Sequence, residues 1–262
     1  MVGQRGKRCQ IIFLIAVIGI VITGCASGSE QRQEKKEGVA GIVQDLYESD
    51  YEFRKTETRY VDLVDDEGNL TDKKGLVTTV YEGQVRANPL ESRMKVIEET
   101  QRGAWEERYV VEEDDSVQMV TKDWEGKTLT MEMGRGFDYA WRYPYGYGKD
   151  LTFEKKGQEK VGEIMCDVYI TSYCEEVSEK EKGVLEAEIF QEYYIDPLEN
   201  RIVMIYTDLS DFYDKTVAME YSSKYDVSLE EAARAVAGTA KGAEDCLEIN
   251  RYREDIEIEP LE

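Results

Sequence analysis

Apolar and polar side chains alternate along most of the chain after Tyr51. Successive side chains of an extended chain point to opposite faces, so alternation is typical of strands with one buried and one solvated face. Two stretches show this most clearly, and the residues that share one face are Val77, Thr79, Tyr81, Val85 and Ala87 in the first and Leu129, Met131 and Met133 in the second. The pattern predicts a β-rich protein.

Short runs of turn-forming residues separate these stretches. They are Asp65-Asp66-Glu67-Gly68-Asn69, Asn88-Pro89, Glu125-Gly126-Lys127 and Asp196-Pro197-Leu198-Glu199-Asn200. The last run joins residues 189–195 to residues 202–207, which predicts a β-hairpin. Strands at this spacing favour an antiparallel sheet, a sandwich or a partial barrel over β-α-β units.

Two segments have helical spacing instead. Residues 38–49 carry apolar residues three or four positions apart, which predicts a short amphipathic helix. Residues 228–241 do the same, with Ser228 as the N-cap and Glu231 in the position of a capping box. Residues 247–258 then alternate again and are expected to form a final strand. The body, residues 38–262, is therefore expected to be a single domain of the α+β class, mostly β.

The first 24 residues have the composition of a secretory signal peptide. Arg5, Lys7 and Arg8 precede an apolar run over residues 11–22. A helix needs about 20 apolar residues to span a bilayer, so this run is too short to be a transmembrane helix. A basic start followed by a short apolar run and small residues indicates export and cleavage.

The run ends in Ile22-Thr23-Gly24-Cys25, which resembles the lipobox of bacterial lipoproteins. The resemblance implies cleavage before Cys25 and acylation of its sulfur, and two or three acyl chains give stable membrane attachment. Residues 25–37 are small, polar and charged, as in a flexible tether. We expect a lipid-anchored protein on the extracytoplasmic face of the cell membrane. The alternative is an uncleaved anchor with an incidental cysteine.

Charge excludes some classes of partner. The formal net charge is −23, and removal of residues 1–24 takes away three basic and no acidic residues, leaving −26. Such a chain lacks the basic surface that nucleic acid requires, so we expect no nucleic-acid partner. The carboxylates are interpreted mainly as solvated surface, with weak calcium binding as the alternative. There is no histidine, which removes the commonest general base and zinc ligand.

Three cysteines, Cys166, Cys174 and Cys246, remain after the signal peptide and the lipid site are set aside. Cys166 and Cys174 fall on one extended stretch, where eight residues span about 26 Å, too far for a disulfide. A bridge from one of them to Cys246 is the more plausible pairing, and three free thiols are the alternative.

No sequence motif indicates an enzyme. Gly134-Arg135-Gly136 lacks the lysine and the strand-to-helix setting of a phosphate loop, and there is no nucleophile elbow. The acidic runs 62–67 and 112–115 lack the spacing of an EF-hand. A hydrolase with two separated carboxylates is the remaining enzymatic alternative. The prediction is a non-enzymatic protein without cofactor or metal.

One segment is unusually rich in aromatic residues, which occupy every second position from Phe137 to Tyr147. In an extended chain these side chains would share one side. They could fill the core of the sheet or form a platform for a ligand, since aromatics combine an apolar body with a polar group. Nearby Pro144, Gly146 and Gly148 favour a loop. The candidate ligand-binding residues are Tyr139, Trp141, Tyr143 and Tyr145.

The order of these segments is similar to the LolA-like superfamily of lipoprotein carriers and mycobacterial lipid-binding lipoproteins. The matching segments are the helix 38–49, Tyr81-x-Gly83-x-Val85 before Pro89, the strand from Gly162 to Tyr169, the hairpin Tyr194-Ile195-Asp196-Pro197 to Arg201-Ile202-Val203, and Ile256-x-Ile258-x-Pro260. This chain departs from the family in its aromatic run and in the helix 228–241.

The resemblance implies a single curved antiparallel sheet, a half-barrel, wrapped around one or more helices with an apolar cavity between. It implies a protein that binds or carries an apolar or amphiphilic ligand. The alternative is an interaction or sensor module at the cell surface that binds a protein or wall polymer and keeps only the fold.

Overall fold

The computed structural model describes residues 38–64, 70–99, 103–111, 116–135, 151–179 and 183–261, which lie in one compact unit. The signal peptide, Cys25 and the tether lie outside the described residues. So do the turn predicted at residues 65–69, the acidic run 112–115 and the aromatic run from Phe137 to Tyr147.

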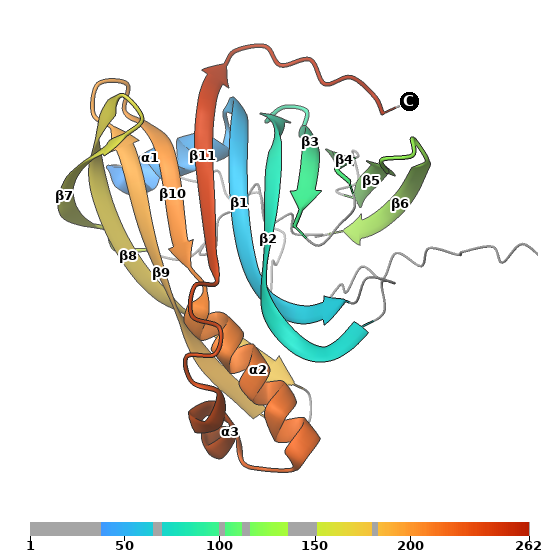
Figure 1. Ribbon diagram of the computed structural model, residues 1–262. Helices are drawn as coiled ribbons and strands as arrows, with labels where there is room; N and C mark the ends of the chain where they lie inside the picture. Colours follow the sequence, from blue (N-terminus) through green and yellow to red (C-terminus); the bar gives the residue numbers. More distant parts are fainter. Residues whose placement is uncertain are drawn as a thin grey trace, which may run out of the picture. The chain divides into compact units, whose positions relative to one another are not determined.

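Eleven strands form one antiparallel sheet (Figure 1). Their bounds are β1 (Asp50–Val64), β2 (Leu70–Arg86), β3 (Glu91–Glu98), β4 (Trp105–Val111), β5 (Ser116–Lys122), β6 (Thr128–Arg135), β7 (Glu154–Val161), β8 (Ile164–Glu179), β9 (Gly183–Asp196), β10 (Arg201–Asp208) and β11 (Glu244–Arg253). The predicted hairpin is β9–β10, with its turn at residues 197–200.

Two meanders meet through the last strand of the chain. The spatial order is β6-β5-β4-β3-β2-β1-β11-β10-β9-β8-β7, so β11 lies between β1 and β10. In β11, Leu247 is opposite Lys55 of β1 and Ile205 of β10. Among the described strands, β6 and β7 are the two edges and do not pair with each other, so the curved sheet that these strands form is open. The predicted fold class, a mostly β domain with one curved antiparallel sheet and helices, is confirmed.

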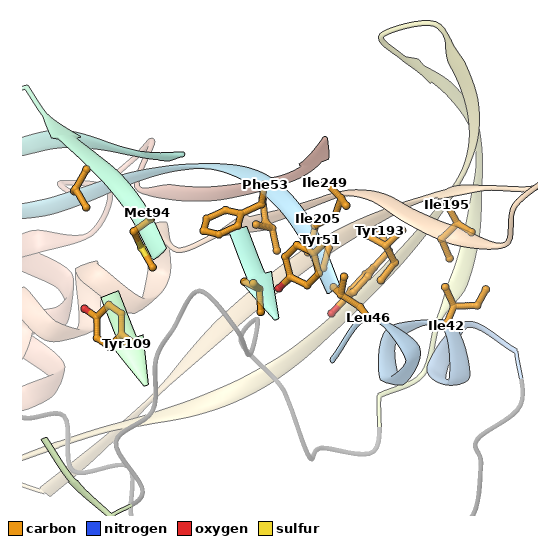
Figure 2. Close-up of a cluster of buried hydrophobic side chains, with 14 of the residues drawn as sticks. Ile42, Leu46, Tyr51, Phe53, Met94, Tyr109, Tyr193, Ile195, Ile205 and Ile249 are labelled. Atoms are coloured by element: carbon orange, nitrogen blue, oxygen red, sulfur yellow. The ribbon is translucent and has the colours of Figure 1, made fainter. Parts of the chain in front are cut away.

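The helix predicted at residues 38–49 is α1 (Val39–Tyr47). Its buried residues Ile42 and Leu46 join the largest apolar cluster of the sheet. Figure 2 shows Leu46 beside Tyr51 and Ile42 facing Ile195. Within the described residues, no helix has the length and apolar content needed to cross a membrane.

Two further helices, α2 (Ser210–Tyr225) and α3 (Leu229–Val236), lie in the chain between β10 and β11. The capping prediction for α3 is confirmed, because Ser228 Oγ accepts a hydrogen bond from the Glu231 amide at 3.2 Å. The helix is shorter than predicted, and residues 237–242 form turns. No sequence pattern predicted α2, because this helix has no single apolar stripe.

The absence of a stripe on α2 follows from its position. Phe212 and Tyr213 join a cluster with β8 and β9, whereas Ala218 packs with Ala232 and Val236 of α3. The helix therefore buries residues on two sides, and its spacing does not resemble that of an amphipathic surface helix. In Figure 1, α2 crosses the ends of β8 and β9 with α3 beside it.

The sheet splits where these helices are inserted. β10 ends at Asp208 and β11 begins at Glu244, while the β1–β2 and β8–β9 pairs continue as separate two-stranded ribbons. α2 packs against the β8–β9 ribbon, and its Glu220 forms an ion pair with Lys74 of β2 at 2.7 Å. The helix thus contacts both ribbons at the split.

Two predictions about the end of the domain were wrong. The final strand ends at Arg253 rather than residue 258, although Ile256 and Ile258 are still buried. Arg93 of β3 donates a hydrogen bond to the Glu259 carbonyl at 3.3 Å, so this segment continues as an extended strap over the sheet rather than as a paired strand.

The suggested bridge to Cys246 is not formed, because Cys246 and Cys166 are free thiols.

Candidate functional site

The face of the sheet that α1 covers carries the main apolar cluster, and we call it the inner face. The cluster extends over strands from both meanders. Its buried members on the sheet include Tyr51, Phe53, Val85, Met94, Tyr109, Met119, Tyr193, Ile195, Ile205, Leu247 and Ile249 (Figure 2). The alternation in the sequence places them all on one side, as expected for a sheet with one buried face.

The inner face changes from apolar to charged along β1. Tyr51 and Phe53 are followed on the same face by Lys55 and Glu57, which are only 3% and 8% exposed. β11 adds Asp245, which lies opposite Glu57. Buried charges are rare unless they are paired. These three side chains are therefore expected to have partners of opposite charge, unlike the apolar core beside them.

A buried ion pair joins β1 to β11. Lys55 Nζ lies 2.8 Å from Asp245 Oδ2. Burial opposes the charged form of Lys55, but Asp245 and Glu57 outweigh it and raise the pKa of the ammonium group. Burial raises the pKa of Asp245 to about 6; Glu57 adds to the rise and Lys55 opposes it. Two carboxylates therefore share one lysine.

A second cation, Arg59, lies close to Glu57. Arg59 Nε lies 3.7 Å from Glu57, and Arg59 Nη2 lies 3.6 Å from Glu98 of β3. Tyr81 donates a hydrogen bond from its hydroxyl to Glu57 at 3.1 Å. Burial opposes ionisation of Glu57, yet Lys55 and Arg59 hold its pKa below the ordinary value.

Neutral polar groups continue the polar part of the inner face across β9 and β10. Gln191 is fully buried and donates to Thr207 Oγ1 at 3.1 Å. Tyr193 donates its hydroxyl to Gln191 Oε1 at 3.0 Å. The inner face thus has an apolar part and a polar part that meet along several strands.

Another carboxylate, Glu107 of β4, has a different environment. Trp105 Nε1 donates to Glu107 Oε1 at 2.7 Å, and the Tyr109 hydroxyl donates to Glu107 Oε2 at 2.9 Å. Burial raises the pKa of Glu107, while these two hydrogen bonds and the charge of Arg59 oppose the rise. Glu107 is opposite Met94 in the β3–β4 register, which places it on the inner face.

The site residues proposed from the sequence lie outside the described residues. These are Cys25 for lipid attachment and Tyr139, Trp141, Tyr143 and Tyr145 for ligand binding. The nearest described aromatic residue after the run is Phe153, whose ring packs edge-on against Tyr193 with centroids 5.3 Å apart. The chain between the two edge strands thus reaches the inner face at its C-terminal end.

The buried carboxylates were not predicted, because acidic residues were interpreted as solvated surface. A signal was present in β1, where Lys55 and Glu57 continue the same alternating face as Tyr51 and Phe53. A charged residue that falls on the apolar face of a strand is a candidate for burial. The partner Asp245 could not be found this way, because it comes from the far end of the domain.

These acidic side chains do not converge as metal ligands. Within the residues that the structure describes, no group of three acidic or cysteine side chains is arranged to hold a metal ion. The carboxylates Glu57 and Asp245 instead face Lys55 and Arg59, whose positive charges disfavour a cation at that position.

Comparison with known proteins gives a structural likeness but no match in sequence. No protein family model matches the chain, and no curated protein is similar in sequence. Among solved structures, the chain is similar to the Mycobacterium tuberculosis lipoprotein LppX, with 12% identity and a TM-score of 0.39 over 85% of this chain and 100% of that one. At that level of similarity we transfer neither ligand nor site residues to this protein.

Proposed function

We propose that this chain is a lipid-anchored lipoprotein of the extracytoplasmic membrane face whose β-rich domain binds an apolar or amphiphilic ligand. The anchor rests on the signal peptide and on Cys25 in its lipobox-like setting. The binding role rests on the inner face, where apolar and charged side chains adjoin within one curved sheet.

The change from apolar to charged on the inner face is the observation that carries the binding role. An amphiphile has the same division, with a chain that favours apolar side chains and a head group that favours polar ones. Each buried CH₂ group contributes about 0.8 kcal/mol, so an acyl chain can bind without any charged contact. Polar groups then set the orientation of the ligand and its selectivity.

Tyr139, Trp141, Tyr143 and Tyr145 remain the predicted ligand contacts in this proposal. Two features support them. The segment connects β6 to β7, which are opposite edges of the sheet, and Phe153 at its described end contacts the inner face. Aromatic side chains there would add apolar area with polar groups at the rim.

A second candidate function is a non-enzymatic interaction module at the cell surface. One observation favours it: Leu46, Tyr51 and Phe53 are each only 1% exposed, so protein already fills the inner face under α1. In this case a protein or wall polymer would bind elsewhere and the apolar cluster would serve stability alone.

Native mass spectrometry of the exported Cys25→Ala chain tests the two candidates. The binding proposal predicts a bound lipid mass that disappears on denaturation, together with uptake of a fluorescent fatty acid by the delipidated protein. A bare protein mass combined with no uptake would contradict the binding proposal and favour the interaction module.

A further inference from the structure

Glu107 is an inner-face carboxylate that accepts two hydrogen bonds from neutral groups. Its two donors are the Trp105 indole at 2.7 Å and the Tyr109 hydroxyl at 2.9 Å, one for each carboxylate oxygen. A carboxylate has about four acceptor positions, so each oxygen can accept one more hydrogen bond. The side chain is half-buried, which leaves it reachable from solvent.

Glu107 also lacks the cation that its neighbours on the inner face have. Asp245 has Lys55 at 2.8 Å, and Glu98 has Arg59 at 3.6 Å. Among the residues that the structure describes, no lysine or arginine forms an ion pair with Glu107. The charge of Arg59 acts on Glu107 without a direct ion pair, so this partly desolvated carboxylate has no cation in contact with it, and a cationic ligand would supply one.

A second polar group on the same face has no partner either. Ser92 of β3 is opposite Tyr109 in the strand register, two residues along from the Met94–Glu107 pair and therefore on the same face. It is fully buried, and its hydroxyl makes no hydrogen bond to any described residue. Buried hydroxyls are nearly always satisfied, so this one indicates a polar group that is supplied from outside the sheet.

Apolar side chains surround these polar groups. Met94 is opposite Glu107, and Met119 is opposite Tyr109 in the adjacent strand pair. Both methionines belong to the main apolar cluster. Methionine adapts its shape to irregular apolar partners, which suits contact with an alkyl chain. Both of these methionines are buried, whereas Met131 of β6, which is opposite Met119, is half-buried, so a head group at Glu107 would have the reachable apolar side chain of Met131 on the same face.

We infer that Glu107 is a head-group site for amphiphiles that carry a primary ammonium group. The ammonium would donate to the open acceptor positions of the carboxylate, which Trp105 and Tyr109 hold in place, and the alkyl part would lie toward Met131. Charge-assisted hydrogen bonds of this kind are about twice as strong as neutral ones. This inference rests on the proposed ligand-binding function.

The test compares three probes with the same tail: decylammonium, decyl maltoside and decyl sulfate, each below its micelle concentration. Binding to the full exported Cys25→Ala chain is measured by calorimetry at physiological salt. We expect decylammonium to bind most tightly and decyl sulfate least. Glu107→Gln keeps the size of the side chain but removes its charge, and should weaken decylammonium binding by about tenfold or more while decyl maltoside binding stays unchanged.

Glu106→Gln is the matched control, because it makes the same change of charge on the neighbouring residue, which pairs with Arg93 on the opposite face of β4. It should leave the binding of all three probes unchanged, which separates a site effect from the general attraction of an acidic protein for cations. Unchanged decyl maltoside affinity also shows that each variant is folded.

Two results would overturn the inference, and they are distinguishable. If decylammonium and decyl maltoside bind equally well, or if Glu107→Gln keeps the preference for decylammonium, the head-group site is wrong while the binding function stands. If none of the three probes binds the parent chain, the proposed function itself fails and the inference fails with it.

Discussion

At the scale of single residues, the charged part of the inner face balances two cations against three carboxylates. Lys55 forms an ion pair with Asp245 and is also stabilised by the charge of Glu57. Arg59 forms ion pairs with Glu57 and Glu98. Removing one member of a buried pair leaves an uncompensated charge, which commonly costs about 3–5 kcal/mol. The stability of this region should therefore depend strongly on Lys55.

Lys55→Met should lower the free energy of unfolding by about 3–5 kcal/mol at pH 8. Lys55 lowers the pKa of Asp245, so in the variant that pKa lies above 6 and the loss should shrink as the pH falls toward 6. Burial raises the pKa of Asp245 from its ordinary value of 3.8 to about 6, so its folded form gains a proton readily below that pH. A protonated Asp245 no longer needs a cation. Urea unfolding at pH 8 and pH 5 measures both effects.

The exposed Lys160→Met on β7 is the control for this variant, because it removes the same charge without a buried partner. Its effect should stay within about 0.5 kcal/mol at either pH. A loss for Lys55→Met that is equally large at both pH values would contradict the role assigned to the carboxylates.

Trp141→Ala tests the predicted ligand contacts. A residue at the rim of the ligand site should cost less than about 1 kcal/mol of stability but reduce the uptake of a fluorescent lipid, whereas a core tryptophan costs about 3–5 kcal/mol. Trp124→Ala, at a 40% exposed tryptophan, should leave uptake unchanged. An unfolded Trp141→Ala variant, or one that takes up lipid normally, would exclude this role.

At the scale of elements, α2 and α3 close the place where the sheet divides. α2 contacts the β8–β9 ribbon, and its Glu220 forms an ion pair with Lys74 of β2. α3 packs against α2. Small residues make that helix contact possible, since Ala218 and Ala232 are both fully buried. The packing leaves little room for a larger side chain.

Ala218→Leu should lower the free energy of unfolding by about 1–3 kcal/mol, because the extra volume overpacks the α2–α3 contact. The exposed Lys224→Leu places the same residue on the solvent side of α2 and should change stability by less than about 0.5 kcal/mol. Chemical denaturation followed by circular dichroism measures both. Equal stability of Ala218→Leu and the parent chain would show that the two helices do not pack tightly.

At the scale of the whole molecule, the proposal joins a membrane anchor to a ligand-binding domain. The residues between them, 26–37, are small, polar and charged, and they are proposed to act as a tether. A carrier on such a tether could collect a ligand from the membrane that holds it. In this proposal the lipid anchor on Cys25 determines where in the cell the protein resides.

Cys25→Ala should remove the acylation site. The protein should then leave the membrane fraction or accumulate as an uncut precursor, and its mature mass should lose the acyl chains. Fractionation with mass spectrometry measures this, and Ser27→Ala is a control that should keep both the membrane location and the mass. Unchanged partitioning and unchanged mass of Cys25→Ala would refute lipid anchoring at this residue.

Local patterns in the sequence determined the elements of this fold. Alternation predicted the strands, the turn at residues 196–200 predicted β9–β10, and Ser228 predicted the start of α3, since each depends on residues that are close in the chain. Those elements favoured an antiparallel sheet, a sandwich or a partial barrel without deciding among the three. α2 was missed because its buried residues contact two different partners, so that no local spacing marks them.

Tertiary structure alone decided the composition of the site. Lys55 and Asp245 come from opposite ends of the domain and meet only because β11 pairs with β1. The environment of Glu107 likewise depends on its neighbours in space, since its sequence does not distinguish it from the solvated Glu106. Burial and charge pairing are properties of long-range contacts, whereas strand and helix formation begin with short-range ones.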